Sequence, residues 1–510
     1  MPSRDSNAAP LSTIVDRVVQ RGDGDRPAVW TDDGPVTYSQ LLRLVKIVAW
    51  RLRALGLRAQ DRVVIELDDS VELVAAFLGA VRMGAVPVPI NPWANFSTQA
   101  IAHSHAKLLI SENAELDIPC EALTGTELTA ATCQDIHLQA PPEPAHSEDQ
   151  AFWLYSSGST GHPKAVVHLH RDVSGACENY AGEVLGMKAT DRCLSTAKLF
   201  HAYGLGGGLL FPLWHGASVT YLRGKPGPSA LCAAIGQFGV TVLFSVPALY
   251  NAVVRRDHEL SMPSLRRCVS AAEPLAPAVW EHWQRKTGIE ILDGVGSTEM
   301  LHIYCSNRPG GVVAGSAGVP VPGYELKLRP GRMDDDDGED EPQELWVRGP
   351  STFDRYWHNQ QATRSAFCGQ WFRTGDCFRL DSDGLYWYLG RVDDMLKISG
   401  LWISANHIEA RLAAHPLVNE SAAISVEARG SNRIKAFVVV NGDLITPNEK
   451  PSLLASLRKW CAQGLPADHV PHHFELIDAL PKSTGGKVQR HILREKLTSA
   501  PQSESRESNV

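Results

Sequence analysis

The chain has 510 residues, of which 44% are hydrophobic and 21% are charged. These proportions are typical of globular proteins and exclude fibrous and disordered chains. The 49 Lys and Arg residues against 57 Asp and Glu residues give a net charge of −8 without a basic stripe, so we expect no nucleic acid partner. The ten cysteines form no Cys-x-x-Cys pair, which argues against a disulfide scaffold and against a structural zinc site.

The sequence predicts neither a secretory signal nor a membrane span. The first residues, MPSRDSNAAP, carry charges of both signs and no apolar stretch, so they do not resemble a secretory signal. The uncharged region from Leu199 to Leu222 is interrupted by glycines, Pro212 and two histidines, which makes it a poor membrane span. We therefore expect a cytoplasmic protein with no membrane partner.

Short apolar runs alternate with segments of helical spacing. Residues 63–67 and 86–90 predict strands, and the apolar residues of 71–78 between them recur at helical spacing. Further short runs at 241–246, 268–269 and 289–292 are separated by segments long enough for helices. This alternation predicts a layered α/β fold whose sheets are covered on both faces.

Composition also indicates domain boundaries. The acidic, Gly- and Pro-flanked run at 331–342 predicts a solvated surface loop. A charged, turn-like stretch follows Gly390, and the residues beyond it, with apolar runs such as 437–440, suffice for a small separate domain. We expect a large domain over 1–390, a hinge at 391–394, a small mobile α+β domain over 395–497 and a disordered tail over 498–510.

The segment YSSGSTGHPK, residues 155–164, combines hydroxyl residues and glycines with a lysine. Its glycines let backbone N–H groups approach an anion, and Lys164 adds a positive charge. It is not a Walker motif, because the residues after Lys164 predict a strand instead of a helix. Taken alone, the segment is either a phosphate-binding loop or an ordinary turn. The candidate phosphate-binding residues are Ser157, Gly158, Ser159, Thr160, Gly161 and Lys164.

Four segments further along the chain favour the phosphate-binding interpretation. They are GVGSTEM (294–300), RTGD (373–376), GRVDDMLKISG (390–400) and PKSTGGKVQR (481–490). In this order and spacing, with the Ser- and Gly-rich loop, the pattern resembles the adenylate-forming superfamily of acyl-CoA synthetases, adenylation domains and luciferases. The segments LFHAYGLG (199–206) and LRRCVSAAEPL (265–275) resemble the benzoate-CoA ligase branch. The resemblance covers residues 10–497 and implies ATP and Mg²⁺, with CoA as the thiol acceptor.

The resemblance also implies roles in nucleotide binding. Lys164 and the loop hydroxyls would hold the β- and γ-phosphates, Thr298 would contact the α-phosphate, and Glu299 would be a Mg²⁺ ligand, as suits a hard cation. Asp376 would accept the two ribose hydroxyls, with Arg391 as a nearby ribose and phosphate contact. The adenine would lie against two strand ends, formed by Ala271, Ala272 and Glu273 and by Asp293 and Gly294.

In the last segment, Lys487 matches the lysine that bridges the substrate carboxylate and the α-phosphate during adenylation. Two glycines precede it in a polar loop, which suits a charge delivered by domain closure. Asp393 matches the hinge residue about which the small domain rotates before thioester formation. Catalysis is thus assigned to Lys487, Thr298 and Glu299.

The aryl-acid pocket implied by the branch combines small and apolar residues. Ala202 and Gly296 would leave room for a flat ring, with Tyr203 and Ile303 as walls. His302 would meet the carboxylate edge or a ring substituent, or serve as a structural histidine. The full set is His201, Ala202, Tyr203, Gly296, Leu301, His302, Ile303 and Lys397.

The chain departs from the family pattern at several positions. Ala165 and Ala272 replace usual glycines, and His201 stands where benzoate ligases often have phenylalanine. Trp402 replaces a phosphate-contacting arginine that the benzoate branch commonly lacks, so that contact is not carried over.

Three hypotheses therefore stand. The first is an aryl-acid:CoA ligase for benzoate, a hydroxybenzoate or anthranilate. The second is an adenylating enzyme that loads a carrier protein's phosphopantetheine, and the third is a non-catalytic nucleotide-binding protein. The sequence also leaves open whether the chain forms a homodimer. A G-x-S-x-G hydrolase elbow is not present in the sequence.

Overall fold

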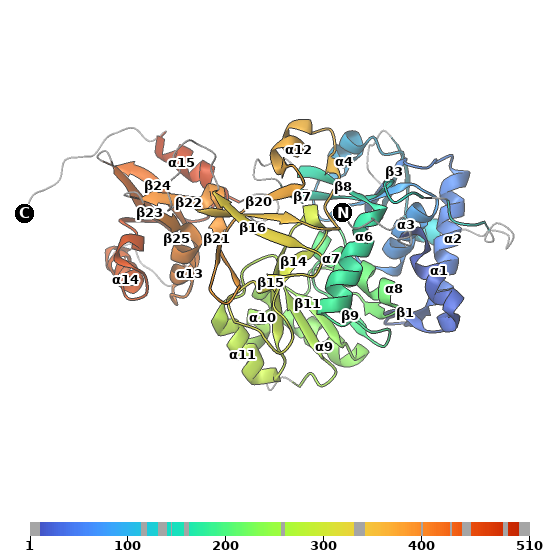
Figure 1. The fold of residues 1–510 in the computed structure, drawn as a ribbon, viewed down its shortest axis with the longest axis horizontal. Coiled ribbons are helices and arrows are strands. Elements are labelled where there is room, and N and C mark those ends of the chain that lie inside the picture. The colour runs from blue at the N-terminus through green and yellow to red at the C-terminus, as the bar shows by residue number, and fades with distance from the viewer. Residues whose placement is uncertain are drawn as a thin grey trace, which may run out of the picture. The chain divides into compact units, whose positions relative to one another are not determined.

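A computed structural model describes residues 11–113, 120–130, 140–143, 145–157, 163–256, 261–330, 342–398, 401–428, 431–440, 450–482 and 488–498. The chain divides into two compact units (Figure 1). The first comprises Met1–Leu326, Val347–Phe372 and Leu380–Trp387, and the second comprises Lys327–Trp346, Arg373–Arg379 and Tyr388–Val510.

The largest sheet of the first unit has nine strands in the order β15-β14-β13-β12-β11-β9-β10-β1-β2. Its central strands, from β13 to β1, run parallel, and antiparallel strands close both edges. The bounds are β1 Pro27–Thr31, β2 Gly34–Thr37, β9 Arg192–Ser195, β10 Ser218–Thr220, β11 Val242–Ser245, β12 Arg267–Ser270, β13 Ile291–Gly296, β14 Ile303–Ser306 and β15 Val319–Pro320.

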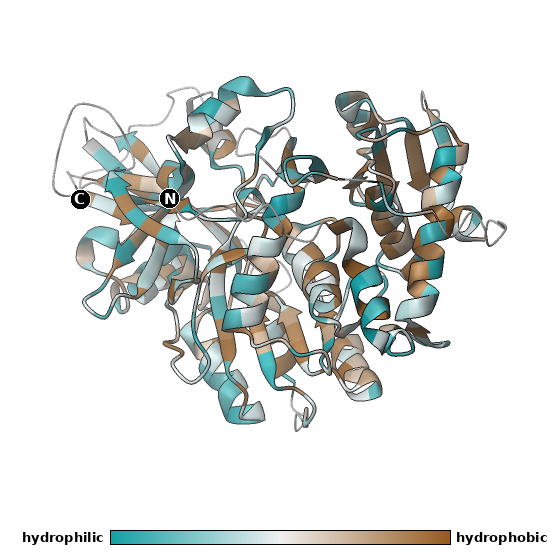
Figure 2. Ribbon diagram, turned by 45° about the vertical axis from the view of Figure 1, so that its right-hand side comes forward, coloured by the Kyte–Doolittle hydropathy of each residue, from teal (hydrophilic) through white to brown (hydrophobic). Residues whose placement is uncertain are grey.

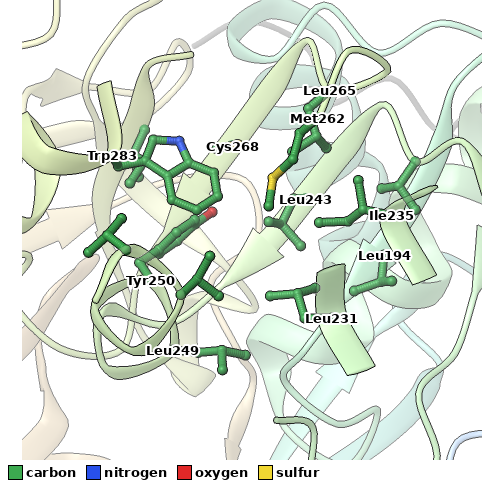
Figure 3. Packing of buried hydrophobic residues seen from close by; sticks show 14 of the residues in the cluster. Leu194, Leu231, Ile235, Leu243, Leu249, Tyr250, Met262, Leu265, Cys268 and Trp283 are labelled. Carbon is green, nitrogen blue, oxygen red and sulfur yellow. The ribbon is translucent and has the colours of Figure 1, made fainter. Parts of the chain in front are cut away.

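Both faces of this sheet are covered. Leu243 in β11 packs in a core with Tyr250 and Trp283 from the helices that follow the strands (Figure 3). Its neighbour Phe244 points to the opposite face, where a Cβ on Gly207 would lie 2.5 Å from the Phe244 ring. The helices are α6 His170–Ala176, α7 Ala202–Leu205, α8 Phe211–His215, α9 Pro228–Phe238, α10 Pro247–Val254 and α11 Pro277–Thr287, and Gly206–Leu210 between α7 and α8 is π-helical.

A second sheet in this unit is parallel throughout, in the order β4-β3-β5-β6. The predicted β-α-β unit is confirmed as β3, α3 and β4, and Ser70 caps α3 by accepting a hydrogen bond from the Leu73 N–H at 3.2 Å. The bounds are β3 Arg62–Glu66, β4 Val86–Pro89, β5 Leu108–Ser111, β6 Glu121–Leu123, α1 Ile14–Val18, α2 Tyr38–Ala54, α3 Val71–Arg82, α4 Ser97–Ser104 and α5 Gly125–Thr129.

A third, antiparallel sheet has the order β18-β8-β7 and carries the Ser- and Gly-rich segment between β7 and β8. The strand predicted after Lys164 is therefore confirmed. The bounds are β7 Gln150–Ser157, β8 Pro163–Leu169, β18 Arg355–Tyr356 and α12 Gln360–Ala366.

A five-stranded sheet, β16-β17-β20-β19 with β21 paired to β20, is crossed by the division between the units. Beyond it the second unit contains the hairpin β22-β23, the sheet β24-β25-β26 and three helices. The bounds are β16 Glu325–Pro330, β17 Gln343–Arg348, β19 Phe367–Cys368, β20 Trp371–Leu380, β21 Tyr386–Arg391, β22 Met395–Ile398, β23 Leu401–Ser404, β24 Val418–Ala428, β25 Ser431–Val440, β26 His473–Leu476, α13 Ala405–Ala413, α14 Lys450–Ala462 and α15 Arg490–Thr498.

The hydropathy pattern matches these layers. Hydrophobic residues lie on the strands and on the inner sides of the helices, and hydrophilic residues lie on the outer helix faces (Figure 2). The predicted α/β class is thus confirmed. Residues 331–341 of the acidic run and 499–510 of the tail lie outside the described residues. No helix in the described part of the chain is long and apolar enough to cross a bilayer.

Candidate active site

The turn that follows β13 is held in place by hydrogen bonds that distant residues donate to its backbone carbonyls. It is a 3₁₀ turn, Thr298–Met300, in the segment GVGSTEM. Its three carbonyl oxygens accept hydrogen bonds, in chain order, from His168 Nε2 (2.8 Å), the Phe353 N–H (2.8 Å) and Ser351 Oγ (2.6 Å). The Glu299 side chain therefore projects from a backbone that two distant segments fix in place.

His168, at the end of β8, is itself held by Asp172. Their side chains are completely buried, and Asp172 Oδ2 lies 3.1 Å from His168 Nδ1. Because the Thr298 carbonyl is only an acceptor, Nε2 must carry a proton. Burial raises the pKa of Asp172, and the hydrogen bond from His168 opposes that rise.

Leu301 leaves the turn in a strained conformation. Its φ of +64° and ψ of −42°, with the His302 N–H donating to the Met300 carbonyl at 2.7 Å, describe a γ-turn of the rare positive-φ type. Leu301 is fully buried, so its packing holds this conformation. The γ-turn connects the Thr298–Met300 turn to His302.

Glu299 and Lys164 meet the same tyrosine. Tyr356 Oη donates a hydrogen bond of 2.8 Å to Glu299 Oε1, and Lys164 Nζ lies 5.1 Å from the centroid of the Tyr356 ring. Ser157 is the last residue of β7, and four other predicted loop residues, Gly158, Ser159, Thr160 and Gly161, lie outside the described residues. No motif in the sequence marked Tyr356, which lies in the aromatic segment RYWHN (355–359).

The predicted adenine-binding residues lie on neighbouring strands: Ala271–Glu273 follow the end of β12, and Asp293 and Gly294 lie within β13. β12 and β13 are parallel neighbours, with Ser270 opposite Asp293, so Ala271–Glu273 and Asp293–Gly294 share one edge of the sheet. Ala272 has a φ of +77°, the conformation for which the family uses glycine. Burial raises the pKa of Asp293 to about 7, although the Ser270 hydroxyl and the Leu275 and Gly294 N–H groups stabilise its anion.

The predicted ring-pocket residues of the first unit also gather. His302 is 3% exposed, and its Nε2 lies 3.2 Å from the Tyr203 carbonyl, which fixes the proton on Nε2. Burial lowers the pKa of His302 to about 3, so the ring is neutral at physiological pH. In the described chain its Nδ1 has no hydrogen-bond partner. The surrounding rings are Tyr180, Tyr203, Phe211 and Phe244.

The other residues predicted to form the ring pocket each have contacts within the fold. A Cβ on Gly296 would lie 2.4 Å from the His302 carbonyl oxygen, so the close approach of β14 already requires glycine there. Ala202 is 7% exposed at the first position of α7, and exposed His201 precedes it. Tyr203 Oη donates to the Ser245 and Val269 carbonyls, which ties α7 to the nine-stranded sheet. Ile303 begins β14 and is buried.

Two predicted ribose contacts meet in the second unit. Arg391 Nη1 lies 2.9 Å from Asp376 Oδ1 and donates to the Thr374 carbonyl at 3.0 Å. Burial opposes the charge of Arg391, but the Asp376 carboxylate outweighs it and raises the pKa of Arg391. Gly375 has a φ of +69°, and a Cβ there would lie 2.7 Å from Arg391 Nη2. Glycine in RTGD therefore lets the guanidinium pack against the strand.

Two further predicted residues of this unit, Asp393 and Lys397, lie in and just after a short turn. Asp393 is exposed in the 3₁₀ turn Val392–Asp394. Lys397 is exposed in β22, with Nζ 5.3 Å from the Trp402 ring centroid. The neighbouring Asp394 pairs with Arg490 at 2.9 Å. Lys487 lies outside the described residues.

Two protein-family models together match most of this chain. Residues 15–357 match the AMP-binding enzyme family, and residues 407–487 match the AMP-binding enzyme C-terminal domain. The chain belongs to the AMP-binding enzyme family. It lies in the benzoate-CoA ligase-like branch of the adenylate-forming superfamily, as its motifs indicate.

Individual relatives of this AMP-binding enzyme are similar over nearly their whole length. A benzoate-CoA ligase of Thauera aromatica is 36% identical, covering 94% of both chains. A 4-hydroxybenzoate-CoA/benzoate-CoA ligase of Rhodopseudomonas palustris is 36% identical, covering 97% of this chain and 95% of the relative. The crystal structure of the anthranilate-CoA ligase AuaEII with anthranoyl-AMP matches with a TM-score of 0.84 at 31% identity, covering 96% and 98% of the chains.

Proposed function

We propose that this AMP-forming acid-thiol ligase converts an aryl carboxylic acid, ATP and CoA into an aryl-CoA thioester, AMP and pyrophosphate. The observation that carries the proposal is the full-length similarity to three ligases named for benzoate, hydroxybenzoate and anthranilate. The ordered Thr298–Met300 turn and the Asp376–Arg391 pair supply side chains suited to a nucleotide.

In the first half-reaction, a carboxylate oxygen attacks the α-phosphorus of ATP, and the bond to the β-phosphate breaks to release pyrophosphate. Both reactants are anionic, so cations and donors must offset the charge that gathers in the transition state. We assign this role to Lys164, Thr298 and Lys487. In the second half-reaction the CoA thiolate attacks the acyl carbon, AMP leaves, and the thiol proton passes to solvent.

Magnesium fits the residues near the proposed phosphate site. No three His, Cys, Asp or Glu residues are grouped as metal ligands within the described ranges, so a cage made of protein alone is not formed there. Mg²⁺ in phosphate-transferring sites uses one or two carboxylates together with phosphate oxygens. Glu299, fixed at Oε1 by Tyr356, is suited to be that carboxylate. The ion would neutralise charge on the phosphates.

For the nucleoside, Asp376 would bind the ribose hydroxyls with Arg391 beside it, and the edge formed by Ala271–Glu273 and Asp293–Gly294 would accept the adenine. The loop residues 157–161 would wrap the β- and γ-phosphates with Lys164. A strand edge at the carboxyl ends of parallel strands is where α/β folds bind such ligands.

For the acid, we assign the ring pocket to Ala202, Tyr203, Gly296, Leu301, His302 and Ile303, with His201 and Lys397 at its border. A neutral His302 with an unprotonated Nδ1 is an acceptor and does not suit a carboxylate, which also only accepts. A ring hydroxyl or amino group carries the matching donor. The proposed substrates are therefore hydroxybenzoates and anthranilate ahead of unsubstituted benzoate.

The domain roles complete the proposal. Residues 1–390 would bind ATP and the acid, and residues 395–497 would move about a hinge at 391–394 centred on Asp393. Rotation would withdraw Lys487 after adenylation and admit the thiol. We place the reaction in the cytoplasm, with neither nucleic acid nor a membrane as partner. A carrier protein is the alternative to CoA as the thiol acceptor. A homodimer is the proposed alternative for the assembly.

An acid panel tests the proposal. ATP-pyrophosphate exchange is measured with benzoate, the three hydroxybenzoates, anthranilate, cinnamate and acetate, and thioester formation is then measured with CoA or with a phosphopantetheinylated carrier protein. We expect exchange with aryl acids, a preference for one that bears a hydroxyl or amino group, and thioester formation with CoA. Faster turnover of acetate would contradict the aryl pocket, and thioester formation on the carrier alone would contradict the acceptor.

A further inference from the structure

Tyr356 lies between two side chains of opposite charge. It is 6% exposed, its hydroxyl donates to Glu299 Oε1 at 2.8 Å, and its ring face lies 5.1 Å from Lys164 Nζ. A phenol can make both contacts at once, because the hydroxyl is at the ring edge and the negative potential is on the ring face.

The position of the ring is fixed by its surroundings. β18 pairs with β8 so that Tyr356 lies opposite Val166, two residues after Lys164. The Tyr356 N–H donates to Thr363 Oγ1 at 3.0 Å, and the Phe353 ring packs against the Tyr356 ring at 4.8 Å. The contacts to Lys164 and Glu299 therefore come from a residue whose backbone and ring are both held by neighbouring groups.

The same short segment also holds the backbone of the acidic residue. The Phe353 N–H donates to the Glu299 carbonyl at 2.8 Å, three residues before Tyr356 contacts the Glu299 carboxylate. Backbone and side chain of Glu299 are thus both oriented from residues 353–356. Such a hydrogen bond to one carboxylate oxygen directs the other toward a metal, as outer partners of metal ligands do elsewhere.

We propose that Tyr356 is a positioning residue for the phosphate site: its hydroxyl orients Glu299 for Mg²⁺, and its ring holds Lys164 ready for the ATP phosphates. The inference rests on the proposed roles of Glu299 and Lys164 in nucleotide binding, but not on the identity of the acid. The two contacts are chemically separable, because Phe retains the ring and removes the hydroxyl, whereas Leu removes both.

The test is nucleotide binding to the full-length protein without acid, measured by calorimetry with ATP in a Mg²⁺ series and with ATP in EDTA. The variants are Tyr356→Phe and Tyr356→Leu, and the control is Tyr38→Phe, which removes a buried hydroxyl that donates to the Ala217 carbonyl. Thermal unfolding of each protein confirms that it is folded at the temperature of the titration.

We expect Tyr356→Phe to raise the Mg²⁺ concentration for half-maximal enhancement of ATP binding by about 10- to 100-fold, the usual cost of losing a second partner of a metal ligand. Binding in EDTA should not change. Tyr356→Leu should add a loss of about 2- to 5-fold in EDTA, because the cation–π contact is gone. The Tyr38→Phe protein should match the parent in both titrations.

An unchanged Mg²⁺ dependence in Tyr356→Phe would overturn the role of the hydroxyl, and equal binding of the Phe and Leu variants in EDTA would overturn the role of the ring. A parent protein that bound no ATP in either condition would instead contradict the proposed function.

Discussion

His168 Nε2 and the Thr298 carbonyl oxygen are joined by a hydrogen bond of 2.8 Å between residues 130 positions apart. The bond ties the end of β8, which follows the proposed phosphate loop, to the turn that presents Glu299. Asp172 holds the other nitrogen of the same ring at 3.1 Å. Three residues from three segments thus fix the geometry between the loop and the turn.

The first prediction concerns this buried pair. His168→Leu leaves the buried Asp172 carboxylate with the Leu169 N–H but without the imidazole, and should lower the free energy of unfolding by about 3–5 kcal/mol. The double variant His168→Leu/Asp172→Leu removes both polar groups and should recover most of that loss. Pyrophosphate exchange should stay reduced in both variants, since neither supports Thr298. Urea unfolding and exchange rates measure the two effects.

The matched control for this prediction is His215→Leu, because His215 also bonds a backbone carbonyl, that of Cys177 at 3.0 Å, outside the turn. It should lose stability without a comparable loss of exchange. Full exchange activity in the double variant would show that the turn keeps its geometry without His168.

The second prediction separates a packing role from a pocket role at Gly296. An added methyl would meet the His302 carbonyl oxygen at 2.4 Å, and backbone gives way less than a side chain does. Gly296→Ala should therefore cost about 1–3 kcal/mol in stability and impair every acid alike. Gly236→Ala in α9, where no heavy atom lies within 4 Å, should gain about 0.5–1 kcal/mol. Unfolding curves and the acid panel test this; a selective loss of aryl acids at unchanged stability would show that the substrate ring, and not the packing of His302, requires glycine at this wall of the proposed pocket.

The third prediction is a pH dependence of stability from Asp293. Its pKa is raised from 3.8 to about 7, so the folded state binds the proton more tightly than the unfolded state. Stability from this group is present below about pH 4 and is lost as the pH rises toward 7, by up to about 4 kcal/mol for a shift of this size. Asp293→Asn should flatten the decline between pH 5 and pH 8. Parallel unfolding curves for the two proteins over that range would contradict the raised pKa.

The fourth prediction concerns Lys487. Lys487→Ala should slow adenylation by about 100- to 1,000-fold, the scale of removing one preorganised transition-state contact. Thioester formation from supplied aryl-adenylate should persist. The control is Lys482→Ala in the same segment, where Lys482 pairs with Glu420 at the surface. An equal loss in both half-reactions would remove Lys487 from the adenylation step.

Local pattern predicted much of the fold. The helix after Ser70 and the strands β11, β12 and β13 follow from the apolar runs and their spacing. The contacts of Tyr356 with Glu299 and Lys164 did not follow, because they join residues 57 positions apart along the chain and more. Spacing also gave no sign that a side chain at Gly296 would meet the His302 carbonyl oxygen.

The left-handed residues mark a second limit of sequence patterns. Leu301 and Ala272 adopt φ values of +64° and +77° without being glycine. At Leu301, which is fully buried, packing overrides local preference, and that packing is not encoded in the neighbouring residues. Both positions lie in the segments to which we assign the nucleotide and the acid.

The most direct test of the central claim follows oxygen atoms from the acid. The enzyme is incubated with ATP, Mg²⁺, CoA and an aryl acid, either benzoate or a hydroxybenzoate, whose carboxylate carries heavy oxygen. The masses of the products are then measured by mass spectrometry. An acyl-adenylate route requires one labelled oxygen in AMP, because the attacking carboxylate oxygen stays on the α-phosphorus when the thiol displaces AMP. Unlabelled AMP, or ADP with labelled inorganic phosphate, would contradict the account.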